Sequence, residues 1–181
     1  MTSPQIVAAL IATVLVFWAV GAYNRLVNLR NRIAQAFAPL DAQTQLRHAL
    51  LARWLLSMPL FVDHAPQAAD AVRAAGAQLQ SACDALRNRP SAARPATSLR
   101  LAEETLAAAR ARFNAELPAR PELLAGVEAA VLADELAAAD STLGFARAQF
   151  NDATRAYNDA LHQFPTGVVA GLFGFRAAGT L

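Results

Sequence analysis

The chain has 181 residues, of which 55% are hydrophobic and 17% are charged, and its formal net charge is +2 at pH 7. A nucleic-acid-binding surface needs clustered basic residues, so we expect no nucleic-acid partner. The single cysteine, Cys83, excludes a disulfide framework within the chain. An alanine-rich composition without Asn-Gly or Asp-Gly turn signals predicts an all-α fold, and the length suits one soluble domain.

The first predicted element is a membrane anchor formed by residues 1–22. Residues 6–23 carry no charge and would span about 27 Å as a helix, close to the ~30 Å hydrocarbon core of a bilayer. A cleaved signal peptide is the alternative, because Val20-Gly21-Ala22 resembles a cleavage site. However, residues 1–5 lack the basic residue that precedes most signal sequences. We therefore expect a single-pass anchor, with the lipid bilayer as a partner.

Basic residues follow this anchor and none precedes it. Arg25, Arg30 and Arg32 lie directly after it, so the positive-inside rule places the C-terminal domain in the cytoplasm and the short N-terminus outside. The same three arginines are candidates for contact with lipid headgroups.

A first soluble helix is predicted over residues 23–57, continuous with the anchor, from its apolar 3-4 spacing. Pro39 lies within this helix and removes one backbone hydrogen bond, so we expect a kink there. Pro59 is expected to end the helix, because the residue before a proline disfavours the α conformation.

Two shorter helices are predicted next, with a loop between them. The second covers about residues 63–89 and begins with Asp63 as its cap. Residues 90–98, PSAARPATS, are expected to form the loop. A third helix of about twenty residues then begins at Leu99, and Pro118 and Pro121 bound the next turn.

A fourth helix over residues 122–163 has the most regular apolar pattern, stepping by four and three like a coiled coil. Its formal charge is −5, whereas that of residues 23–57 is +4. The two long helices should therefore lie side by side in an antiparallel up-down-up-down four-helix bundle covering residues 23–164. Near the membrane we expect residues 23–37 and 146–164 to form a two-helix stalk.

A Gly/Phe-rich tail, residues 165–181, is predicted to lie near the membrane. Its apolar run over residues 168–175 would reach only about 12 Å as a helix and cannot span a bilayer, so an interfacial or stalk-capping position is expected. Phe164, Phe173 and Phe175 are the candidates for lipid contact there.

Both ends of the predicted bundle resemble the LemA family. Residues 23–33, YNRLVNLRNRI, are similar to the family's YN-x-LV-x-LRNRV opening, and ARAQFN at 146–151, YN at 157–158, FP at 164–165 and FGF at 173–175 resemble its closing elements. Residues 49–55, ALLARWL, depart from the family's DLIPNLV, which indicates a divergent member. The resemblance implies a membrane-anchored helical bundle, mostly bacterial, without an established catalytic site.

Polar residues near the membrane form the candidate interaction set. Asn151 and Asn158 repeat one heptad position, which suits either register between the first and last helices or a partner-binding surface. The full set is Asn24, Asn28, Asn31, Arg147, Asn151, Tyr157 and Asn158.

No catalytic, cofactor or metal site is expected. His48, His64 and His162 lie far apart in sequence, and His48, in the middle of a predicted helix, has no Asp, Glu or Cys beside it at metal-binding spacing. Cys83 has no evident base. We expect a scaffold or adaptor in the bacterial inner membrane that binds an unidentified membrane or cytoplasmic protein, or associates with itself as a homo-oligomer. A membrane-remodelling role of the tail is the alternative, and an enzyme that depends on Asp140 or Arg147 is the second.

Overall fold

The computed structural model describes residues 3–116 and 122–181, and this part of the chain is all-α, as predicted. The helices are α1 (Ser3–Leu56), α2 (Pro59–His64), α3 (Pro66–Asn88), α4 (Ala93–Glu116), α5 (Glu122–His162) and α6 (Thr166–Phe173). The predicted turn at Pro118 and Pro121 lies outside the described residues.

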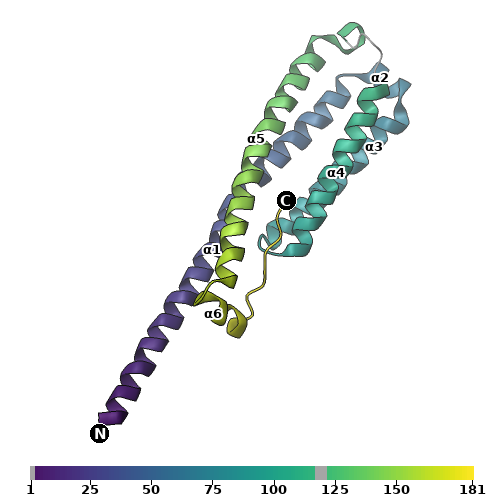
Figure 1. Cartoon of the computed structure of the whole chain (residues 1–181). Helices are drawn as coiled ribbons and strands as arrows, with labels where there is room; N and C mark the ends of the chain where they lie inside the picture. Colours follow the sequence, from purple (N-terminus) through teal and green to yellow (C-terminus); the bar gives the residue numbers. More distant parts are fainter. Residues whose placement is uncertain (1–2, 117–121) are drawn as a thin grey trace.

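Helix α1 joins the predicted anchor and the first bundle helix in one 54-residue rod that continues through Pro39. An apolar segment near its N-terminus, with a mean hydropathy of 2.3, is long and apolar enough to cross a membrane. Only 6% of this segment is buried inside the protein. This part projects beyond the rest of the molecule (Figure 1). Helix α1 ends at Leu56, and Pro59 becomes the first residue of α2, where its missing N–H group costs no hydrogen bond.

The bundle has the predicted up-down-up-down order. Helix α1 leads away from the N-terminal end, α3 returns, α4 ascends and α5 returns again (Figure 1). Helix α5 packs along α1, while α3 and α4 form a second antiparallel pair that contacts α1 through α3. The long outer helices therefore lie side by side, as predicted.

The predicted loop over residues 90–98 is wrong, because α4 already begins at Ala93. Pro95 lies in its first turn, where a proline fits without breaking a helical hydrogen bond. Ala96 and Leu99 are buried and hold this turn against the core. Packing therefore overrides the loop-like composition.

Apolar contact dominates the interface between α1 and α5. The apolar residues of α5 at the predicted four-and-three spacing are buried from Leu132 to Ala160, apart from the half-buried Ala153. Among them, Phe150 packs edge to face on Phe37 of α1, with 6.1 Å between the ring centroids. Burial ends before Phe164, which is 80% exposed.

Charged groups of α1 link it to three other helices. Arg47, only 6% exposed, donates to Glu103 of α4 at 2.6 Å and to Asp140 of α5 at 3.4 Å. Asp140 also accepts from Arg110 of α4 at 2.9 Å. Asp41 pairs with Arg87 of α3 at 2.7 Å. In the described structure, the ion pairs between α1 and α5 are confined to Arg47 and Asp140, so the opposite net charges of these helices meet at one point and not along their length.

The substitution Arg47→Ala should destabilise the bundle by about 3 kcal/mol, because it leaves two carboxylates without their most buried cation. Chemical denaturation in detergent, followed by far-UV circular dichroism, measures this change. Arg155→Ala is the control, since the side chain of Arg155 is 64% exposed and its one ion pair within the described residues is with Asp152 of its own helix. The cost of this substitution should stay below about 0.5 kcal/mol. Equal losses from the two variants would contradict a stabilising role for the network.

Candidate functional site

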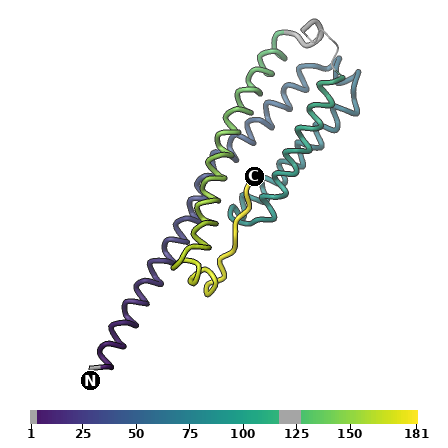
Figure 2. Tube along the Cα trace, in the orientation of Figure 1, coloured from purple at the N-terminus to yellow at the C-terminus, as the bar shows by residue number. Residues whose placement is uncertain are grey.

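A glycine reverses the chain after α6. Gly174 has φ +70°, a left-handed conformation that favours glycine, and the N–H of Phe175 donates to the carbonyl of Ala170 at 3.0 Å. This cap ends α6 and turns residues 175–181 back along α5. Figure 2 shows this segment, which we call the tail segment, running away from the N-terminal end toward the middle of the molecule.

Two asparagines of α5 hold the backbone of the tail segment. The side-chain amide of Asn158 donates to the carbonyl of Ala178 at 2.9 Å and accepts from its N–H at 2.8 Å. Asn151 makes the same pair of bonds with Leu181, both at 2.8 Å. Each amide thus satisfies both backbone groups of one residue, as a neighbouring β-strand would. We call this arrangement the asparagine clasp.

The spacing of the clasp follows from helix and strand geometry. Seven residues of α5 rise about 10.5 Å, and three residues of extended chain cover about 10 Å. Asn151 and Asn158 therefore match Leu181 and Ala178 in register. Two residues before Ala178, the carbonyl of Arg176 accepts a hydrogen bond from the hydroxyl of Tyr157 at 3.0 Å.

The tail segment also touches the start of α4. A Cβ atom placed on Gly179 would lie 2.8 Å from the Cβ of Ala96 and 2.9 Å from the backbone of Ala93, so this contact requires glycine. Ala178 is buried. The tail segment consequently ties α5 to α4.

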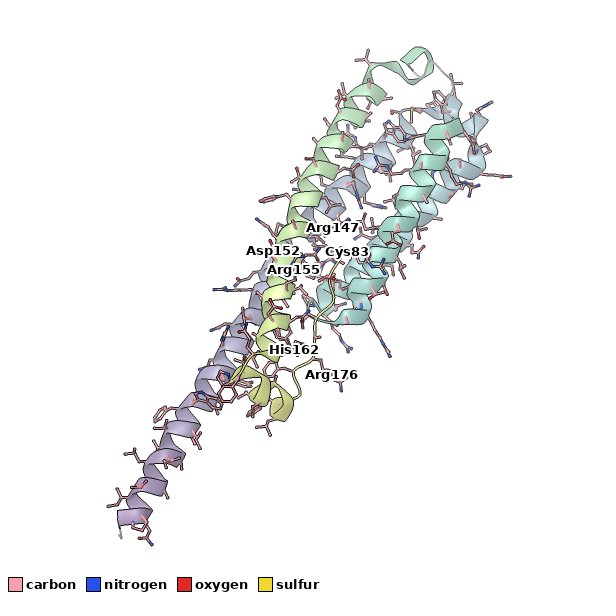
Figure 3. The ribbon with its side chains drawn as sticks, in the orientation of Figure 1. Cys83, Arg147, Asp152, Arg155, His162 and Arg176 are labelled. Carbon is pink, nitrogen blue, oxygen red and sulfur yellow. The ribbon has the colours of Figure 1, made fainter. Side chains whose placement is uncertain are left out.

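The structure brings together only part of the predicted interaction set. Asn151, Tyr157 and Asn158 meet at the tail segment, whereas the predicted register role would have placed the asparagines against α1. Arg147 does not join them: it lies apart from Arg176 of the tail segment (Figure 3) and forms an ion pair with Glu103 of α4 at 3.5 Å. In the described structure the α1 members make no side-chain hydrogen bond and are exposed; these are Asn24, Asn28 and Asn31.

The predicted lipid-contact aromatics gather where the anchor meets the bundle. The ring of Phe164 lies 5.3 Å from that of Trp18, and Phe173 and Phe175 lie 5.1 and 5.6 Å from Tyr23. The last helix therefore returns to the end of the anchor, as predicted. Helix α6 packs against both α1 and α5 there, which agrees with the stalk-capping position expected for this segment.

The predicted lipid-contact arginines have different surroundings. Arg25 donates to the side chain of Gln163 at 3.1 Å, and Arg32 is exposed. Arg30 donates to the hydroxyl of Ser91, in the connection between α3 and α4, at 3.2 Å. Arg30 therefore faces the α3–α4 pair.

Cys83 is buried beside Asp41. Burial, followed by the thiol's hydrogen bond to the Asp41 carboxylate at 3.2 Å, raises the pKa of Cys83 to about 12. Hydrogen bonds from Arg87 lower the pKa of Asp41. The thiol therefore stays protonated at neutral pH, which makes it a poor nucleophile. Within the described ranges, no group of three His, Cys, Asp or Glu residues is placed to hold a metal ion.

The sequence model of the LemA family matches residues 36–181, which include most of the bundle, α6 and the clasp. The chain belongs to the LemA family. A comparison with curated proteins and one with solved structures returned no match. LemA family proteins are membrane-associated, in agreement with the apolar start of α1.

Asn158→Asp tests the clasp in this LemA protein. The introduced carboxylate can accept from the N–H of Ala178 but cannot donate to its carbonyl, so the tail segment should open more often by roughly tenfold. Hydrogen exchange at Ala178 and Leu181, corrected for intrinsic rates, measures the opening. Asn28→Asp is the control, because the side chain of Asn28 is exposed and makes no hydrogen bond to any residue that the structure describes.

Lowering the pH provides a second check. Protonation restores a donor to the introduced carboxyl group, so protection of the tail segment should recover in Asn158→Asp as pH falls. Unchanged exchange at neutral pH would contradict a holding role for the clasp.

Proposed function

We propose that the protein is a non-enzymatic scaffold of the bacterial inner membrane, with its bundle in the cytoplasm and a protein-binding surface at the end farthest from the membrane. The observation that carries this proposal is a set of large apolar side chains exposed at that end. They lie at the end of α1, on α2 and at the start of α5.

This distal apolar surface consists of Leu56, Leu60, Val127 and Val131. Their exposures are 76%, 63%, 83% and 50%. Helix α2 contacts both α1 and α5, so these side chains lie on neighbouring elements. Apolar residues grouped on a surface mark interaction sites, whereas isolated ones are common on any protein. A protein partner with a complementary apolar face is therefore the proposed occupant.

Helix α1 would hold this surface at a defined height. From Tyr23 to Leu56 the helix rises about 50 Å, without a break in its helical backbone. The orientation proposed here follows from Arg25, Arg30 and Arg32, which follow the apolar segment and favour the cytoplasmic side. The partner would then meet the scaffold well inside the cytoplasm.

Site-specific photocrosslinking in cells tests the distal surface. A photoreactive residue at Leu60 should give a discrete adduct, whereas one at Leu101 of α4, which is 49% exposed, should give none. An adduct containing a second protein supports the proposal. An adduct of two copies of this 19.2 kDa chain would identify self-association instead, and equal labelling from both positions would contradict a specific surface.

A second candidate function, organisation of lipids by α6, has its own supporting observation. Phe164, Val168, Leu172 and Phe173 are each more than half exposed, and Phe164 packs on Trp18 of the apolar segment. Eight helical residues reach only about 12 Å, so α6 would lie in the interface.

A spin label at Leu172 measures this insertion. Because Cys83 is buried and its thiol stays protonated, Leu172→Cys can be labelled selectively in the reconstituted protein. The label should be more accessible to oxygen than to a water-soluble nickel complex, and a label at Leu101→Cys should show the reverse. If both labels behave alike, α6 does not enter the membrane.

A further inference from the structure

A basic cleft lies between the start of α4, the tail segment and α1. Its volume is about 730 Å³, which lies within the range of small-molecule sites. The arginines that line it come from three separate segments of the chain, and they are Arg30, Arg89, Arg94 and Arg176. No acidic residue of the described chain lines it.

These arginines lack the acidic partners that seven other arginines of the described chain have. In the described part of the chain, none of the four forms an ion pair, and Arg30 bonds only to the neutral hydroxyl of Ser91. By contrast, Arg87 is paired with both Asp41 and Asp84. The cleft therefore concentrates positive charge that the protein itself does not neutralise.

We propose that this cleft binds the phosphate of an anionic phospholipid headgroup. Guanidinium groups present planar pairs of N–H donors that match phosphate oxygens. The first turn of α4 borders the cleft and contains no acidic residue, so the positive end of the helix dipole adds to the attraction. The ligand chemistry is thus a phosphate group.

The position of the cleft favours a lipid over a soluble phosphate. It extends along α1 from Tyr23, at the end of the apolar segment, to Arg30, a rise of about 10 Å. The headgroup layer extends about 5–8 Å beyond the hydrocarbon core, so the part of the cleft nearest Tyr23 would lie within it. Phe173 and Phe175 line the same cleft, and Phe173 is 61% exposed. A lipid could place its phosphate among the arginines and its chains along this aromatic edge.

The site goes beyond the scaffold role and shares no residue with the distal apolar surface, so either proposal can fail alone. The test uses the full chain in nanodiscs of phosphatidylcholine with phosphatidylglycerol. After mild delipidation, native mass spectrometry measures the phosphatidylglycerol that each protein retains.

The combined variant R89Q/R94Q/R176Q should retain less phosphatidylglycerol by roughly tenfold or more. The charge-matched control R53Q/R73Q/R112Q, whose positions are exposed toward the far end of the bundle, should retain as much as the unaltered protein. R89K/R94K/R176K preserves the charge and should keep an intermediate amount. Equal retention by the first two variants would overturn the site.

A second arm distinguishes the lipid from a soluble anion. In nanodiscs of phosphatidylcholine alone, calorimetric titration with inorganic phosphate should show no binding that depends on the cleft arginines. Arginine-dependent phosphate binding there, without selective retention of phosphatidylglycerol in the first arm, would overturn the lipid assignment.

Discussion

The apolar contact between α1 and α5 is the constraint on which the rest of the structure depends. Near the N-terminus, the exposed part of helix α1 has apolar residues on all sides. Where α5 packs against α1, the apolar residues of α1 are concentrated on one buried face. The α3–α4 pair then packs against α1 through α3, and α6 packs where α5 returns to the apolar segment. The ion pairs of Arg47 add specificity to this assembly, because they can form only when α1, α4 and α5 are correctly placed.

Helical periodicity predicted the long elements well. It placed the end of α1 within one residue and identified the buried face of α5, because a repeated apolar spacing leads directly to a packed face. It failed at the start of α4, where buried Ala96 and Leu99 stabilise a turn whose composition is typical of a loop. The start of α4 could not be predicted from local composition, because it depends on packing against residues that are distant in the sequence.

The candidate site was predictable only in part. The seven-residue spacing of Asn151 and Asn158 showed that they share a face, but an extended segment has no helical period and so their partner could not be inferred. The basic cleft was missed because Arg30, Arg89 and Arg176 are far apart in sequence. One signal was available: residues 85–102 contain several arginines and no acidic residue, which is unusual in a chain with nearly balanced charge.

The asparagine clasp recognises backbone rather than side chains. Its four hydrogen bonds go to the N–H and carbonyl groups of Ala178 and Leu181, which every residue except proline can offer. Ala177 and Thr180 are exposed, whereas the buried Ala178 and the close approach of Gly179 to α4 restrict these two positions to small residues. The exposed residues of this segment can therefore be substituted during evolution while the segment stays docked along the same path.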